Sequence, residues 1–188
     1  MVLIKNGYTI KDIPTMTLKF NLKMSTDHSF KLKIIEYSIS YTEEFYNYVR
    51  DYPLNKFEYN NNSFYIKQKE DQELLKQVDT YVKPIADEHN SVLDNTWIQH
   101  YDKGHFHDLH IHGSGEFLSF IWYIDCTENS SSTTFFNQGY PYIETHKLII
   151  KPKKNKFILF DGTIPHLVSP NKDTTRLIVS GNLKKSWN

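Results

Sequence analysis

The histidines of this chain are concentrated in one short stretch, which is typical of a metal site. Five of the nine histidines lie within thirteen residues, at His100, His105, His107, His110 and His112. On a β-strand, side chains two residues apart face the same side, so His110 and His112 can present both imidazoles to one ion. His105 and His107 have the same spacing. A solvent-facing polar edge or a hydrogen-bonded histidine pair would give the same pattern, so this spacing needs support from elsewhere.

A third histidine far along the chain supplies that support. The apolar stretch 157–160 ends in a turn, and His166 is predicted to open the next strand. Two ligands from one strand and a third from a distant strand make a three-point facial site, whose open positions iron needs for oxygen and a co-substrate. Ten residues later, Arg176 begins an apolar strand. Inside a barrel near a metal, its guanidinium would need a planar anion, and a ligand carboxylate is the bidentate partner it prefers.

The elements that must position these residues are short strands separated by turns. The second half of the chain predicts strands at 96–101, 116–125, 132–136, 147–151, 156–160 and 175–182. Many short strands at close spacing favour a closed barrel or sandwich, in which edges are hidden. We therefore predict a mainly β (α+β) fold of the double-stranded β-helix, or jelly-roll, type.

The first half predicts a mixed scaffold with strands at 17–22 and 30–38. A helix is predicted at 42–52, where Thr42 can cap it and Glu43 and Glu44 suit its positive end. A second helix is predicted at 71–88 from apolar residues at three- and four-residue steps, although Pro84 interrupts it. Residues 60–62, all asparagine, predict a turn. We expect these helices to pack on one outer face of a single domain spanning 1–188, with 1–94 as scaffold and 95–184 as the catalytic core.

Composition narrows the class of protein. The 22 Lys and Arg residues balance the 22 Asp and Glu residues, so no net field attracts nucleic acid or anionic lipid. The single cysteine, Cys126, cannot form an internal disulfide, and no apolar run approaches the roughly 18 residues of a membrane span. The first residues become polar too early for a signal peptide. We expect a cytoplasmic protein with no membrane partner, and nucleic acid is disfavoured.

Residues 95–184 resemble the iron(II)/2-oxoglutarate oxygenases of prolyl-hydroxylase type, and most of all the compact oxygenases of bacteria and tailed phages. Each motif is weak alone, but their ordered spacing is specific. The resemblance runs through Tyr101 and Gly104, His110-Ile111-His112, residues 118–124, Thr134-Phe135-Phe136, residues 151–160, residues 166–170, Arg176 and Asn182.

The resemblance implies that His110 and His166 bind iron(II) and that Arg176 pairs with the distal carboxylate of 2-oxoglutarate. It also places Tyr101 and Tyr123 near that co-substrate. Prolyl hydroxylases carry an aspartate two residues after the first histidine, whereas this chain has His112. Either His112 is a third ligand in an all-imidazole site, or water or Asp108 completes the shell. The strand period favours His112, which lies on the side of His110.

The activity implied is oxidation of an unidentified substrate by O2 with 2-oxoglutarate as co-substrate. Hydroxylation of an unactivated C–H bond would accompany release of succinate and CO2. Substrate contacts are expected from loops at 102–108, 113–115, 129–132 and 138–142. A peptide or a small molecule is the favoured substrate, and the sequence leaves the oligomeric state open.

A cupin is the nearest alternative. Gly104, His110-Ile111-His112 and Glu116 follow the first cupin motif, which would make Glu116 a fourth ligand. The second motif fits less well, because Gly162 lies four residues before His166 rather than three, and cupins give Arg176 no role. Such a protein would be a three-histidine dioxygenase, an isomerase or a binding module without 2-oxoglutarate. A barrel that has lost its chemistry is a further alternative, but the intact histidine and arginine set argues against it.

Overall fold

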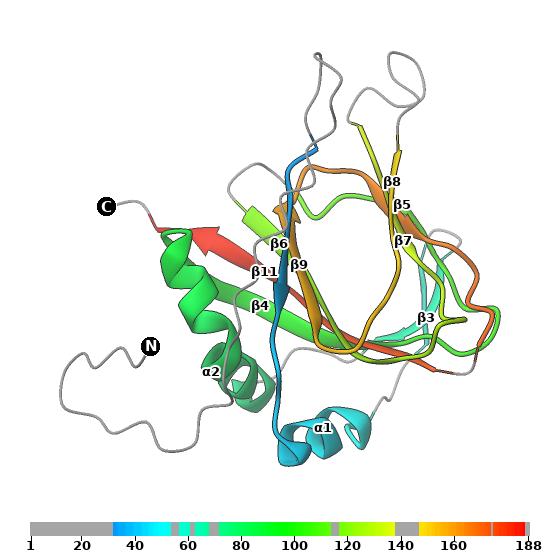
Figure 1. Ribbon diagram of the computed structural model, residues 1–188, viewed down its shortest axis with the longest axis horizontal. Helices are drawn as coiled ribbons and strands as arrows, with labels where there is room; N and C mark the ends of the chain where they lie inside the picture. Colours follow the sequence, from blue (N-terminus) through cyan, green and yellow to red (C-terminus); the bar gives the residue numbers. More distant parts are fainter. Residues whose placement is uncertain are drawn as a thin grey trace.

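The computed structural model describes residues 32–53, 57–60, 63–67, 72–113, 117–137, 147–173 and 175–186. This part of the chain forms two antiparallel β-sheets and two helices (Figure 1). The seven-stranded sheet has the order β1-β9-β6-β11-β4-β3-β2, with β1 Ile34–Ser38, β2 Phe57–Asn60, β3 Ser63–Lys67, β4 Ser91–His100, β6 Phe117–Cys126, β9 Lys156–Asp161 and β11 Arg176–Lys185. The four-stranded sheet has the order β5-β10-β7-β8, with β5 His107–His110, β7 Thr133–Phe136, β8 Lys147–Ile150 and β10 His166–Val168.

Alternation along the strands of the large sheet divides the core into two clusters. On β6, Phe120 and Trp122 belong to the cluster that contains the helices, whereas Ile121 and Tyr123 belong to the cluster between the sheets. Successive strand residues point to opposite faces, so strands β1, β6, β9 and β11 each contribute to both clusters. The face toward the small sheet is therefore the inner face of the sandwich, and it is the face that carries Tyr123.

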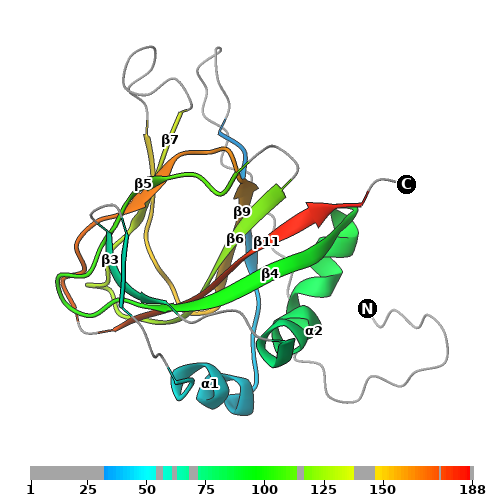
Figure 2. The same ribbon diagram turned by 180° about the vertical axis from the view of Figure 1, so that it is seen from behind.

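The two helices lie beside the large sheet, on the side away from the small sheet, in both views (Figures 1 and 2). Helix α1 (Glu43–Arg50) is capped at its N-terminus by Thr42, whose hydroxyl accepts a hydrogen bond from the Phe45 amide at 3.2 Å. Helix α2 (Gln72–Glu88) continues through Pro84. Its buried apolar residues share one cluster with the outer face of the sheet, so packing holds the helix together where proline removes a backbone donor.

The mainly β, two-sheet architecture predicted from the sequence is consistent with a jelly roll. The predicted strands of the second half correspond to β4, β6, β7, β8, β9 and β11, and β10 begins at His166 as expected. Strands β2 and β3 were not predicted, and β4 begins at Ser91 rather than at residue 96. The strand expected to carry the paired histidines is β5, which ends at His110. The predicted strand at 17–22 lies outside the described residues. Neither helix of the described part is long and apolar enough to cross a membrane.

Candidate metal and co-substrate site

Strand pairing brings two of the predicted ligands together. In the ladder between β5 and β10, His166 lies directly opposite His110. Residues opposite each other in an antiparallel pair project from the same face with Cβ atoms about 4.5–5.5 Å apart. The two imidazole centroids are 4.2 Å apart. The register of this short ladder therefore brings together two of the three histidines.

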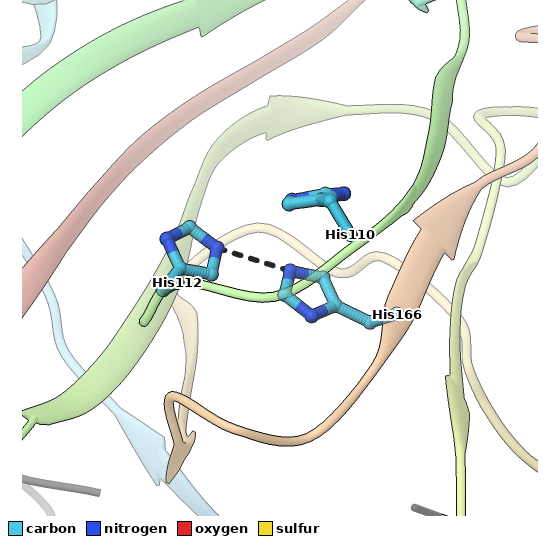
Figure 3. A group of neighbouring side chains, drawn as sticks. All are labelled: His110, His112 and His166. Carbon is cyan, nitrogen blue, oxygen red and sulfur yellow. Dashed lines mark hydrogen bonds between the residues drawn. The ribbon is translucent and has the colours of Figure 1, made fainter. Parts of the chain in front are cut away.

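His112 reaches the cluster by another route. Strand β5 ends at His110, so the expectation that His110 and His112 share a strand is not met. Instead, the His112 amide donates to the Gly162 carbonyl at 2.8 Å, in the turn that precedes β10. Nε2 of His112 then lies 3.1 Å from Nε2 of His166 (Figure 3). The Trp97 ring stacks on the His112 ring, with centroids 5.6 Å apart. One candidate ligand nitrogen from each of the three histidines lies within 4.8 Å of the other two.

The backbone determines which nitrogen of each ring is available. Nδ1 of His110 lies 2.7 Å from the Asp108 carbonyl oxygen, and Nδ1 of His166 lies 2.9 Å from that of Ile164. A carbonyl only accepts, so both rings carry their proton on Nδ1, which makes Nε2 the nitrogen of each ring that can bind a metal. Burial, followed by the nearby His110 and His112 rings, holds the pKa of His166 well below its usual value. The imidazole is thus kept in the neutral form that binds metal.

The residues present fit a divalent transition metal. Three neutral imidazoles suit iron, zinc, copper or nickel rather than magnesium or calcium, and they leave the ion's full charge uncompensated. Within the described part of the chain, the side chain of Asp108 does not belong to the cluster, whereas its carbonyl orients His110. Glu116, the fourth ligand of the cupin alternative, lies outside the described residues.

Arg176 forms a second candidate binding element on the inner face of β11. Its side chain is fully buried, with Nε donating to the Ser131 carbonyl at 3.0 Å and Nη2 donating to the Thr133 hydroxyl at 3.0 Å. Nη1 is buried and has no hydrogen-bond partner among the described residues. No carboxylate in the described ranges pairs with this guanidinium. A buried cation with an unused donor is costly unless an anion joins it, so the residues fit a carboxylate ligand.

The two predicted tyrosines both lie beside this guanidinium. Cζ of Arg176 is 4.5 Å from the Tyr101 ring centroid and 5.4 Å from that of Tyr123. The Tyr123 hydroxyl is 2.9 Å from the Thr133 hydroxyl, and burial raises the pKa of Tyr123. Both phenols are fully buried, and a phenol hydroxyl can donate a hydrogen bond to an anion held there.

Strand β7 contacts both Arg176 and the histidine cluster. Thr133 bonds Arg176, and Phe135 lies opposite His166 with its ring stacked at 5.4 Å from the imidazole. Residues two apart share a face and are separated by about 7 Å along a strand. The two candidate binding elements are therefore neighbours. Sequence reasoning missed Thr133 and Ser131, because a hydroxyl and a carbonyl in a strand carry no signal of their own.

The remaining histidines of the cluster-rich stretch differ in their surroundings. His105 is buried in a turn, where its Nδ1 accepts from the Asp102 amide at 3.1 Å. His107 lies on β5 with its ring stacked on His110 at 3.7 Å. The loop at 138–142 and residues 114–115, predicted to contact substrate, lie outside the described residues.

Comparison with known proteins found likeness in structure alone. No protein-family model matches the sequence, and no curated protein sequence matches it. Among solved structures, the viral collagen prolyl hydroxylase of Paramecium bursaria Chlorella virus-1, in complex with 2-oxoglutarate, is 13% identical with a TM-score of 0.57, over 82% of this chain and 96% of that chain. HygX from Streptomyces hygroscopicus, with nickel, 2-oxoglutarate and hygromycin B bound, is 9% identical with a TM-score of 0.58, over 82% and 83% of the two chains.

A third neighbour broadens the range of reactions on this fold. SnoN, a non-heme α-ketoglutarate-dependent epimerase from nogalamycin biosynthesis, is 11% identical with a TM-score of 0.64, over 81% of this chain and 78% of that chain. At such identities the likeness establishes a shared fold. The fold that the sequence resemblance implies is thus confirmed, whereas the fold alone does not select one reaction.

Proposed function

We propose that this protein is an iron(II)- and 2-oxoglutarate-dependent oxygenase on a double-stranded β-helix, with His110, His112 and His166 as metal ligands. Arg176 would hold the distal carboxylate of 2-oxoglutarate, with Tyr101 and Tyr123 beside it. When bound, iron(II), 2-oxoglutarate and O2 would supply the oxidative chemistry, in which release of succinate and CO2 accompanies hydroxylation of a substrate C–H bond. The solved neighbours include proteins that bind a peptide or a small molecule, and a substrate of either kind is proposed here.

The protein's own residues would bind and orient the metal and the co-substrate. The Nδ1 contacts of His110 and His166 orient the two rings, so that Nε2 of each would bind the metal. Arg176 would fix one end of the co-substrate through charge-assisted hydrogen bonds, which are roughly twice as strong as neutral ones. The buried rings of Phe135 and Phe160 lie 5.4 and 4.9 Å from the His166 ring and would keep water away from the metal.

The observation that carries the proposal is the fully buried Arg176, whose Nη1 has no hydrogen-bond partner among the described residues. Its Nη2 donates to Thr133 of β7, the strand that pairs with β10 beside the three converging imidazoles. The test is anaerobic addition of iron(II) and 2-oxoglutarate, followed by a search for the weak visible charge-transfer band of a chelated ketoacid. The wild type should give the band, and Arg176→Ala should weaken it at equal co-substrate.

Arg50→Ala is the matched control, because Arg50 is the chain's other arginine and forms an exposed pair with Asp51 on α1. It should retain the wild-type band. Metal binding without a band at saturating 2-oxoglutarate would contradict the proposal. It would then favour a cupin-type three-histidine dioxygenase, isomerase or binding module, the candidate that the all-imidazole ligand set supports.

A further inference from the structure

His107 is a fourth histidine in direct contact with the proposed metal centre. It stands at the opposite end of β5 from His110, and the two imidazoles are nearly parallel, with centroids 3.7 Å apart and planes 13° apart. This is the closest ring pair described in the molecule. His107 is half-buried and lies opposite Val168 of β10, so the same ladder that sets the ligands also holds His107.

His107 also contacts one of the residues beside Arg176. Its Nδ1 lies 3.5 Å from the Tyr101 hydroxyl. Tyr101 is fully buried, and its ring lies 4.5 Å from the Arg176 guanidinium carbon. A continuous set of contacts therefore runs from the proposed anion site through Tyr101 and His107 to the ligand His110.

We propose that His107 is a positioning residue for the metal centre, an inference that rests on the proposed metal site. The carbonyl of Asp108 fixes one atom of the His110 ring, and the His107 face fixes the plane of that ring. A metal-bound imidazole is electron-poor, so a neutral ring stacked on it gains an attraction like that between a cation and an aromatic face. Outer contacts that orient a ligand typically change metal affinity by 10–100-fold.

His105, in the same stretch, is not one of the clustered metal-ligand candidates and serves as a comparison for His107. It is buried, its Nδ1 accepts from the Asp102 amide, and its carbonyl accepts from the Asn171 amide at 2.8 Å. These contacts stabilise the turn before β5. His105 and His107 therefore have different roles despite their two-residue spacing: His105 stabilises the turn, whereas His107 would position His110.

Two substitutions separate the ring of His107 from its hydrogen bond. His107→Phe keeps a flat ring over His110 but removes the bond to Tyr101, whereas His107→Asn keeps a polar group near the place of Nδ1 but removes the ring. Affinity for Co(II) and Zn(II) is measured by chelator competition, together with the visible spectrum of the Co(II) protein. We expect His107→Asn to weaken binding by about 10–100-fold and to alter the Co(II) spectrum, and His107→Phe to stay within about threefold of the wild type. Wild-type affinity in His107→Asn, or an equal loss in both variants, would overturn the inference.

The wild-type protein provides a measurement that needs no variant to fold. During Zn(II) titration followed by NMR, the ring protons of His107 should shift with those of His110, while those of His105 stay in place. Equal shifts of His105 and His107, or none in His107, would overturn the inference. If the wild type binds neither metal, the proposed function fails; if it binds both and His107→Asn matches it, only the role of His107 fails.

Discussion

At the scale of single residues, Arg176 combines a cost to the fold with a use in binding. Its guanidinium is fully buried, and Nη1 has no hydrogen-bond partner in the described part of the chain. Replacing a whole buried ion pair by apolar residues is often neutral or stabilising by about 1–4 kcal/mol, and a single buried charge also carries a cost of removal from water. We expect Arg176→Met to unfold at the wild-type temperature or above it when no ligand is present, and to lose the stabilisation that 2-oxoglutarate gives the metal-loaded wild type. Thermal unfolding with and without 2-oxoglutarate measures both effects; a variant that is much less stable without ligand would show that Arg176 serves the fold instead.

The choice between His112 and Asp108 as third ligand also belongs to single residues. The ring of His112 is in the cluster, whereas Asp108 contributes its backbone carbonyl, which any residue at that position retains. We expect His112→Leu to weaken metal binding by more than the roughly 100-fold upper range of an outer contact, and Asp108→Asn to remain within about threefold of the wild type. Zn(II) competition titrations compare the two. A larger loss in Asp108→Asn would restore the carboxylate alternative.

At the scale of elements, the sequence predicted the strands that have a regular apolar pattern, but it did not predict which strands pair with each other. Strands β6, β9 and β11 are apolar over several residues and were recognised. Strand β5 has no apolar alternation, so only the spacing of its histidines indicated a strand; its pairing with β10 could not be predicted. The convergence of three histidines was expected, but the route of His112 through the Gly162 carbonyl was not, because no local pattern reveals a contact between two turns.

The junction of β1 with the end of α2 predicts a pH dependence of stability. Nε2 of His89 lies 2.7 Å from the Tyr37 hydroxyl, and burial, assisted by Lys33 and opposed by Glu88, lowers the pKa of His89. The unfolded chain, with a histidine pKa near 6.5, then takes up a proton that the native state resists. The stabilising effect of neutral His89 is present above that pH and is lost as the pH falls through it.

We therefore expect the wild type to exceed His89→Gln in free energy of unfolding at pH 7.5 and to lose much of that advantage at pH 5. Urea denaturation of the metal-free proteins at both values measures it. Groups common to both proteins cancel in the difference. A difference that stays constant between the two pH values would mean that His89 titrates alike in the folded and unfolded chain.

At the scale of the whole molecule, the two proposed binding elements belong to different sheets. His110 and His166 lie on strands of the small sheet, whereas Arg176 begins β11 in the large sheet. The hydrogen bond from Arg176 to Thr133 of β7 already crosses between the sheets. A co-substrate held by both elements would join them more firmly, so its effect on stability should extend across the sandwich rather than remain at the metal.

Hydrogen exchange can separate the two steps. A diamagnetic metal such as Zn(II) should first slow exchange of amides in β5 and β10, and 2-oxoglutarate added to the metal-loaded protein should extend the protection to β7 and the first residues of β11. At 100 times the dissociation constant, a ligand adds about 2.7 kcal/mol, or roughly 100-fold in protection, to openings that release it. Arg176→Ala should keep the first step and lose the second. Protection by 2-oxoglutarate confined to β5 and β10, or the same extension in Arg176→Ala, would show that the co-substrate does not connect the two sheets through this arginine.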